Sequence, residues 1–181
     1  MKKYGFGIDV GGTTVKVGFF ETSGALLDKW EIKTNTANGG EAILPDIAKT
    51  IEEKLSKEGI SKDEVQGIGI GVPGPVLNAS VVTRCVNLGW GEIDVAGTLS
   101  KITGLPVKVG NDANVAALGE MWQGGAKGSS NVVMVTLGTG VGGGIIVDGR
   151  IVAGANGAGG EIGHLNVCED ELDNEKFGES L

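Results

Sequence analysis

The sequence reads IDVGGTTVK at residues 8–16 and TLGTGVGGG at residues 136–144. In both stretches an apolar run leads into a turn of glycine and threonine, and a second apolar run follows. Successive backbone N–H groups in such a turn form a concavity that binds anions. Two such turns in one chain predict two halves of one nucleotide site. We call them the first glycine turn (residues 11–14) and the second glycine turn (residues 138–140).

The first glycine turn has the chemistry that a phosphate group requires. Gly11 and Gly12 supply a tight hairpin turn with no Cβ atom in the way of a ligand. Thr13 and Thr14 add hydroxyl donors. Asp9 ends the preceding strand, where a carboxylate can hold the water shell of Mg²⁺.

The second glycine turn lies in a stretch that repeats this layout, with an expected strand at 132–137, a glycine-rich turn across 138–144 and a second strand at 145–147. Its candidate phosphate-binding residues are Gly138, Thr139 and Gly140. A single glycine turn can serve only to connect two strands, because short motifs also occur by chance. The presence of two turns of the same kind favours a ligand site over that simpler explanation.

The composition excludes several classes of protein. The 181 residues carry a formal net charge of −8, which opposes non-specific binding to nucleic acid. Two cysteines are too few for a disulfide framework and favour a reducing compartment. No apolar stretch is long enough to span a membrane. We therefore expect a cytoplasmic protein that binds neither nucleic acid nor membrane.

Hydrophobic periodicity predicts an α/β sheet domain over residues 1–110. Its strands alternate with helices of 3.6-residue periodicity, and the strand at 65–71 has no polar face, which predicts burial on both sides of a sheet. Glycine at 59 is expected to end the first helix. The predicted strands lie at 3–10, 15–20, 25–33, 65–71 and 106–109, and the predicted helices lie at 40–57, 94–102 and 112–122.

A second α/β domain is expected to start at residue 111 and to run to residue 164. Its hairpin strands lie within 131–152, and an acidic tail without apolar periodicity follows at 165–181. We expect its sheet to have an uncovered apolar face and an exposed edge strand.

Asp112 is the candidate catalytic residue. It lies in the stretch GNDAN, which follows a predicted strand and opens a predicted helix. A carboxylate there can be a helix N-cap. It can also be a general base at the carboxyl end of a strand, where open α/β sheets bind ligands. A sugar kinase needs one carboxylate near the attacking hydroxyl.

Glu161 and His164, the only histidine of the chain, lie in the glycine-rich stretch GGEIGH. Both side chains can form hydrogen bonds with sugar hydroxyls. A lone histidine is more often an ordinary polar residue, but the neighbouring glutamate and glycines favour a ligand contact.

Five stretches together resemble the ROK family of sugar kinases and repressors, and most of all its bacterial glucokinases. They are IDVGGTTVK, GIGVPGPV, GNDANVAALGE, LGTGVGGGI and GANGAGGEIGH, in that order between residues 4 and 164. The resemblance implies the actin/hexokinase-like (ribonuclease H-like) ATPase fold, with two duplicated α/β domains around a cleft. We expect the first domain to be complete here and the second to be truncated.

The resemblance also implies roles for individual residues. Asp112 is the base that deprotonates the sugar 6-hydroxyl. The sugar hydroxyls are held by Asn87, Asn111, Glu161 and His164. The phosphates of ATP, which brings Mg²⁺, are held by Asp9, Gly11, Gly12, Thr13, Thr14, Gly138, Thr139 and Gly140.

The family also carries a zinc site, formed by the histidine of GEIGH and a downstream cysteine cluster. In this sequence Cys168 alone follows His164. Two ligands do not close a tetrahedral site. We therefore expect His164 to be a zinc ligand only if other groups complete the site.

The resemblance favours ATP-dependent phosphorylation of glucose, by a chain that has little activity alone and tends to form a homodimer. The alternatives are a non-catalytic fragment that binds sugar, a kinase for another hexose such as N-acetylmannosamine or fructose, and a sugar-responsive repressor. The repressor is disfavoured, because only seven residues precede Ile8, which leaves no room for a DNA-binding helix-turn-helix.

Overall fold

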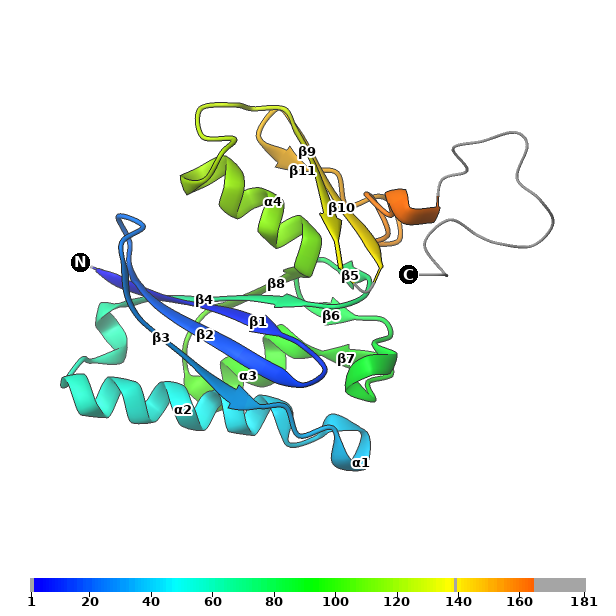
Figure 1. The fold of residues 1–181 in the computed structure, drawn as a ribbon. Coiled ribbons are helices and arrows are strands. Elements are labelled where there is room, and N and C mark those ends of the chain that lie inside the picture. The colour runs from blue at the N-terminus through cyan, green and yellow to red at the C-terminus, as the bar shows by residue number, and fades with distance from the viewer. Residues whose placement is uncertain (1, 139, 165–181) are drawn as a thin grey trace, which may run out of the picture. The chain divides into compact units, whose positions relative to one another are not determined.

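The computed structural model describes residues 2–138 and 140–164, and the chain divides into two compact units, Met1–Asp112 and Ala113–Leu181 (Figure 1). The first unit is built on a five-stranded sheet of order β3-β2-β1-β4-β8. The strands are β1 (Tyr4–Val10), β2 (Thr14–Glu21), β3 (Leu26–Lys33), β4 (Val65–Val72) and β8 (Val107–Asn111).

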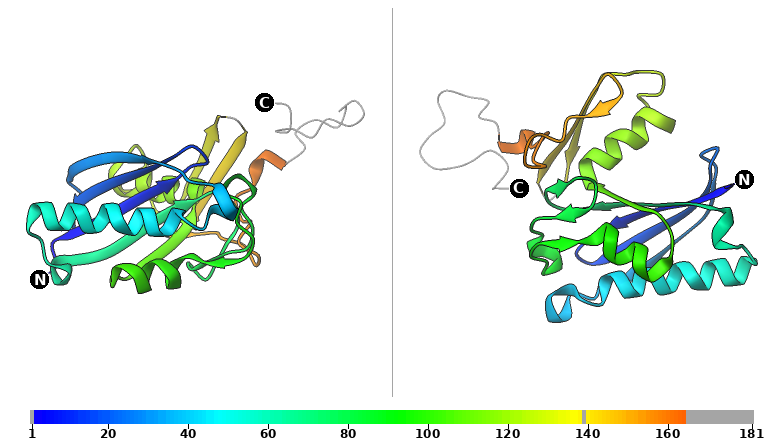
Figure 2. Two further views of the ribbon diagram at one scale, coloured as in Figure 1. Left: turned by 90° about the horizontal axis from the view of Figure 1, so that it is seen from below. Right: turned by 180° about the vertical axis from the view of Figure 1, so that it is seen from behind.

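The sheet combines hairpins with crossovers. The pairs β1–β2 and β2–β3 are antiparallel, whereas β1–β4 and β4–β8 are parallel. Parallel neighbours require a crossover, which is usually a helix. Here the crossovers contain α2 (Ile43–Glu58) and α3 (Val95–Thr103). Both helices cover the same face of the sheet, as the two views of Figure 2 agree.

Local signals set the ends of these helices. Gly59 has a left-handed φ of 66°, and its N–H bonds to the carbonyl oxygens of Leu55 and Ser56, so α2 ends at Glu58. The predicted stop at residue 59 is confirmed. The Asp94 carboxylate accepts a hydrogen bond of 2.9 Å from the Gly97 N–H and caps the start of α3.

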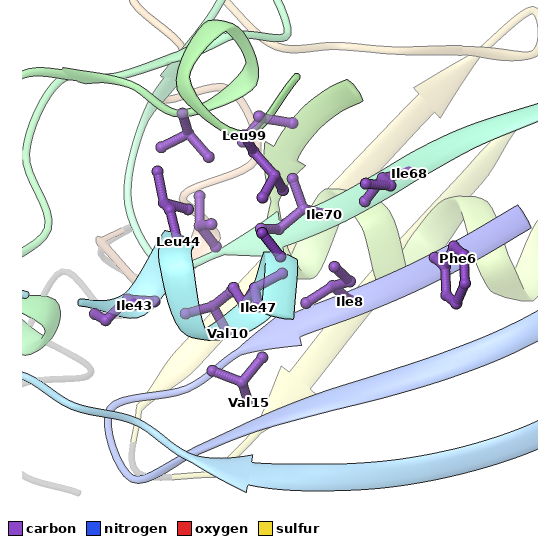
Figure 3. Close-up of a cluster of buried hydrophobic side chains, with 14 of the residues drawn as sticks. Phe6, Ile8, Val10, Val15, Ile43, Leu44, Ile47, Ile68, Ile70 and Leu99 are labelled. Atoms are coloured by element: carbon purple, nitrogen blue, oxygen red, sulfur yellow. The ribbon is translucent and has the colours of Figure 1, made fainter. Parts of the chain in front are cut away.

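The core of the first unit lies between the helices and the sheet. Ile8 and Val10 of β1 lie near Ile47 and Leu99 of the two helices, and Phe6 joins the same core farther along β1 (Figure 3). All five side chains are buried, and a fully buried side chain of this kind contributes roughly 1.5–3 kcal/mol. The alternating burial of β1 follows from its sequence, because glycine and aspartate occupy the other face.

Glycine leaves room on that other face. The ring of Phe20 lies where side chains at Gly7 and Gly18 would stand, with its Cε2 atom 3.2 Å and 2.5 Å from ideal Cβ positions there. The prediction that the strand at 65–71 is buried on both faces is wrong, since Gln66 and Gly69 are exposed. Glycine has no side chain, so this face of the strand presents little apolar surface that would have to be buried.

The predicted helix at 40–57 begins too early. α2 starts at Ile43, and the preceding element α1 (Ala37–Gly40) contains left-handed residues at Asn38, Gly39 and Gly40. The sequence prediction also missed several short elements. These are η1 (Lys62–Glu64), β5 (Val76–Leu77), β6 (Val81–Val82), η2 (Val86–Leu88) and β7 (Ile93–Asp94), of which β5, β6 and β7 form a small antiparallel sheet.

The second unit packs α4 (Asp112–Gln123), most of which belongs to it, on one face of a three-stranded sheet. The sheet contains β11 (Arg150–Ile151), β10 (Val141–Val147) and β9 (Val132–Leu137), in that order, and η3 (Ile162–His164) follows. Gly144 lets α4 approach closely, because a Cβ there would lie 2.7 Å from both the Ala113 carbonyl oxygen and the Ala117 Cβ. The predicted hairpin strands within 131–152 are confirmed, but β10 begins at Val141 and not at residue 145, because Gly142, Gly143 and Gly144 pair with β9.

The buried face of α4 differs from the prediction. The spacing of Val115, Leu118, Met121 and Trp122 indicated an apolar stripe, but the buried residues of α4 are Ala113, Asn114 and Ala117. Val115 and Trp122 are exposed. Small residues occupy the buried face of α4 because they allow the helix to pack closely on the glycines of β10.

On the sheet face opposite α4 the side chains of β9 are apolar and exposed, whereas β10 is covered at Gly143 by Gly160 and Ile162. Val133, Val135 and Leu137 of β9 are 69%, 52% and 79% exposed. β9 is also the edge strand of the sheet as far as the described residues extend. The expected exposed edge is thus confirmed for the described residues, and the expected uncovered face is confirmed only along β9. Within the described residues no helix is long and apolar enough to cross a membrane.

Lys54 joins α2 to the hairpin of the first unit. Its Nζ atom donates to the carboxylates of Asp28 and Glu58, each at 2.7 Å, and lies 5.6 Å from the ring centroid of Phe19. The hydrogen bond from Lys54 lowers the pKa of Asp28 below its ordinary value, and the bonds to Asp28 and Glu58 raise the pKa of Lys54.

We predict that Lys54→Met lowers the midpoint of thermal unfolding by about 2–4 °C at pH 7. The pKa of Asp28 is lower in the folded state than its ordinary value of 3.8. The stability that the ion pair of Asp28 and Lys54 contributes is therefore fully present above pH 3.8 and is lost as the pH falls through the folded pKa. The difference between wild type and variant should therefore shrink at pH 3. Lys62→Met is the control, since Lys62 pairs with Glu52 in a more exposed position. An equal loss in both variants would contradict this account.

We also predict that replacing both Val133 and Val135 with threonine lowers the binding of a hydrophobic fluorescent dye and the self-association of the 181-residue chain. Threonine keeps the β-branched shape but removes apolar surface. Sedimentation velocity measures the association. Val132→Thr, on the α4 face of the same strand, should instead reduce stability and leave association unreduced.

Candidate active site

The candidate residues of the first unit gather at one edge of its sheet. The parallel registers align Asp9 with Gly71 and Gly71 with Gly110, so β1, β4 and β8 end together. Asn111 ends β8, and Asp112 follows it as the first residue of α4. Two strand spacings, about 10 Å, separate β1 from β8. The carboxyl edge of parallel strands is where open α/β sheets bind ligands.

The first glycine turn closes on itself at this edge. The Gly11 N–H donates to the Thr14 carbonyl oxygen at 3.0 Å. Thr34, directly after β3, donates its hydroxyl to the Gly11 carbonyl oxygen at 2.6 Å and its N–H to the Thr13 carbonyl oxygen at 2.9 Å. Gly12 and Thr13 are exposed, so their backbone faces solvent.

Asn87 lies beside this turn. It belongs to η2, in a loop closed by the bridge between Cys85 and Trp90. An ideal Cβ on Gly12 would lie 3.5 Å from the Asn87 carbonyl oxygen. The Asn87 residue is exposed. Sequence spacing alone could not bring residues 12 and 87 together, so the structure supports the pairing of a sugar-binding candidate with a phosphate-binding one.

Asp112 acts electrostatically on the same loop. Burial raises the pKa of the Cys85 thiol, and the negative charge of Asp112 raises it further. Asn111 is fixed beside Asp112, because its amide Nδ2 donates to the Gly74 carbonyl oxygen at 3.3 Å.

Asp9, in β1 just before the first glycine turn, is a candidate metal ligand. Its carboxylate is exposed, and its Oδ2 atom lies 3.9 Å from the Lys16 Nζ atom. An exposed carboxylate oxygen is the kind of ligand that Mg²⁺ accepts through its waters.

The candidates of the second unit gather around the start of β10. The Gly138 N–H donates to the Gly140 carbonyl oxygen at 3.0 Å, while Thr139 lies outside the described residues. The loop that carries Glu161 and His164 packs on the same hairpin. Gly163 has no room for a Cβ against the Val141 backbone. The glycines of this loop thus bring Glu161 and His164, both exposed, next to the second glycine turn.

His164 is the described member of the possible zinc site, and its other candidate ligand lies outside the described residues. Within residues 2–138 and 140–164, no three or more histidine, cysteine, aspartate or glutamate side chains gather as metal ligands would. His164 is exposed at the end of η3, and Cys168 lies outside the described residues. We assign no reaction step to zinc.

A model of the ROK family matches residues 5–176. The chain belongs to the ROK family. The match runs from the start of β1 to beyond His164, and so includes both glycine turns and the stretch that carries Asp112.

Individual relatives in the ROK family agree with this assignment. The chain is 48% identical over 165 residues to the glucokinase of Halalkalibacterium halodurans, covering 91% of this chain and 50% of that protein. It is 38% identical over 163 residues to the glucokinase of Thermotoga maritima, covering 89% and 50%. The chain thus spans about half the length of the curated relatives it matches.

The fold agrees with solved ROK structures. The ROK family glucokinase from Streptomyces griseus, determined in complex with glucose and AMPPNP, matches with a TM-score of 0.78 and 34% sequence identity. The match covers 93% of this chain and 52% of that chain. The actin/hexokinase-like fold expected from the sequence is therefore confirmed for the part of the ROK fold that this chain contains.

Gly74 is a site feature that sequence reasoning missed. Its φ is 101°, and an added Cβ would lie 2.5 Å from the Arg84 carbonyl oxygen. Only glycine fits here, and the same residue offers the carbonyl oxygen that holds Asn111. The stretch GVPGPV gave a signal of a turn, but not of its hydrogen-bond partner.

We predict that Gly74→Ala lowers the free energy of unfolding by at least about 1 kcal/mol more than Gly59→Ala. Both glycines are left-handed, which costs alanine roughly 1–2 kcal/mol, but nothing lies within 4 Å of a Cβ on Gly59. Urea denaturation measures the difference. The NMR signal of the Asn111 side-chain amide should shift in Gly74→Ala only. Equal stability losses with an unchanged amide signal would contradict the role of Gly74.

Proposed function

We propose that this chain carries the catalytic base of an ATP-dependent hexose kinase that phosphorylates glucose at its 6-hydroxyl. The observation that carries the proposal is the position of Asp112 at the carboxyl end of β8, on the sheet edge that also holds the first glycine turn. The similarity to glucokinases supports glucose as the substrate.

In this mechanism Asp112 accepts the proton of the 6-hydroxyl as the hydroxyl oxygen attacks the γ-phosphorus of ATP. The bond from oxygen to phosphorus forms, the bond from the γ-phosphorus to the β-phosphate bridging oxygen breaks, and ADP leaves. Such a reaction depends mainly on positioning and on neutralising charge. Mg²⁺ bound with ATP would neutralise phosphate charge, and Asp9 would hold its water shell.

The sugar is held in this proposal by Asn87 and Asn111 from the first unit and by Glu161 and His164 from the second. Asn111 is well suited to this role, because the bond to Gly74 fixes its amide. Amide, carboxylate and imidazole groups together can donate to and accept from neighbouring hydroxyls. The phosphates are held by the backbone of the two glycine turns and by the Thr13, Thr14 and Thr139 hydroxyls.

The proposed activity belongs to proteins about twice as long as this chain, since the matched relatives are covered to about 50%. We therefore expect the 181 residues alone to turn over glucose slowly. We further propose a place in cytoplasmic carbohydrate metabolism and assembly as a homodimer. A sugar-binding fragment without turnover, or preference for another hexose, is the alternative that the assay below distinguishes.

We predict that any glucose-dependent formation of ADP by the purified chain with Mg²⁺ and ATP falls about 10²–10⁴-fold in Asp112→Asn. The affinity for glucose, measured by calorimetry, should change little, because the amide keeps the size of the side chain. Asp148→Asn, in the turn between β10 and β11, is the matched control and should keep the wild-type rate.

Three results would count against the proposal or part of it. Turnover without loss in Asp112→Asn would remove Asp112 as the base. Loss of glucose binding together with turnover would favour a structural capping role for Asp112. A rate constant above about 1 s⁻¹, typical of ordinary enzymes, would refute the expectation that the chain alone is slow. A panel of hexoses in the same assay identifies the preferred sugar.

A further inference from the structure

Thr34 is an unusual residue for its position. It directly follows β3 and is only 5% exposed. Buried polar residues are few among those that the structure describes: Thr34, Thr103 and Asn114. The Thr103 hydroxyl bonds within its own helix, to the Leu99 carbonyl oxygen at 2.8 Å. Thr34 instead reaches across to a different segment of the chain.

Thr34 donates two hydrogen bonds to the first glycine turn. Its hydroxyl donates to the Gly11 carbonyl oxygen at 2.6 Å, and its N–H donates to the Thr13 carbonyl oxygen at 2.9 Å. One residue thus fixes two of the peptide planes in the turn. The bond is part-buried, so losing this hydroxyl would remove the donor that holds the Gly11 carbonyl oxygen on the side of Thr34.

Fixing a carbonyl group also fixes the next N–H group. The peptide bond is planar and trans, so its N–H points opposite to its C=O. No peptide in the described chain is cis. With the Gly11 oxygen held toward Thr34, the Gly12 N–H points away from Thr34. Neither Gly12 nor Thr13 donates its N–H to another described residue, and both are exposed. The Gly12 N–H is the one oriented through the Gly11 carbonyl, and exposed backbone N–H groups in such a turn can bind an anion.

The chain that follows Thr34 is itself anchored. An ideal Cβ on Gly39 would lie 3.5 Å from the Gly89 carbonyl oxygen. The Trp90 Nε1 atom donates to the Gly40 carbonyl oxygen at 3.2 Å. Thr34 is therefore held by the sheet on one side and by residues 39–40 on the other, which makes it a rigid support for the turn.

We propose that Thr34 is a positioning residue that orients the backbone N–H groups of the first glycine turn toward the phosphates of the nucleotide. The nucleotide is part of the function proposed above, and this inference rests on it. Thr34 does not touch the phosphates itself. It acts through the carbonyl groups of Gly11 and Thr13.

The test compares Thr34→Val, which removes the hydroxyl at constant shape, with Thr34→Ser, which keeps it. Thr103→Val is the matched control, because it removes another buried hydroxyl far along the chain from the turn. Thr34→Val should weaken binding of Mg²⁺-ATP about tenfold in calorimetry and leave glucose binding unchanged. Thr34→Ser should restore near wild-type affinity. Thr103→Val should lower the unfolding midpoint without weakening ATP binding.

A second readout does not depend on nucleotide binding. In the unliganded chain, the ¹H–¹⁵N heteronuclear NOE of the Gly12 and Thr13 amides should fall in Thr34→Val and stay unchanged in Thr34→Ser and Thr103→Val. If wild type binds no ATP, the nucleotide part of the proposed function fails, and this NOE alone decides whether Thr34 orders the turn. Unchanged ATP affinity in Thr34→Val, an equal loss in Thr103→Val, or unchanged NOE values would overturn the proposal.

Discussion

The parallel pairing of β4 with β1 on one side and with β8 on the other determines where the chemistry of the first unit can occur. Parallel strands end at the same edge, so Asp9 and Asn111 come to one side of the sheet although about a hundred residues separate them in the sequence. The crossover helices needed for this pairing cover one face and supply the core. The core therefore stabilises the same arrangement that aligns the site.

Glycine serves a different physical purpose in each part of the chain. At Gly74 it permits a positive φ, and the carbonyl oxygen of this residue accepts a hydrogen bond from the Asn111 side chain. At Gly144 it lets the backbone of α4 approach β10 closely. At Gly12 it leaves a backbone open to solvent. The high glycine content of the sequence, 34 residues, thus reflects backbone contacts and backbone exposure that side chains would block.

The sequence was sufficient for features that depend on local signals. The β10–β11 turn follows from Asp148 and Gly149, which both adopt positive φ, and the end of α2 follows from Gly59. Features that depend on the register between strands could not be predicted from the sequence. Thr34 looks like any threonine after a strand until the β2–β3 pairing brings it to the turn. Periodicity also failed on α4, because it weighs apolar size, whereas packing against glycine selects small residues.

The family motifs identified most of the candidate site residues, because they sit in stretches whose order and spacing are specific. The motifs did not predict which other residues contact these candidates and hold them in place. Asn87 lies beside Gly12 only because the loop from Cys85 to Trp90 folds back, and η2 is too short for periodicity to detect. The ring of Phe20 has an evolutionary consequence of the same kind. It fills the space that side chains at Gly7 and Gly18 would occupy, so a bulkier residue at either position is compatible only with a smaller one at position 20. A larger residue at position 7 or 18 is therefore expected only after position 20 has become smaller, whereas position 20 can become smaller on its own.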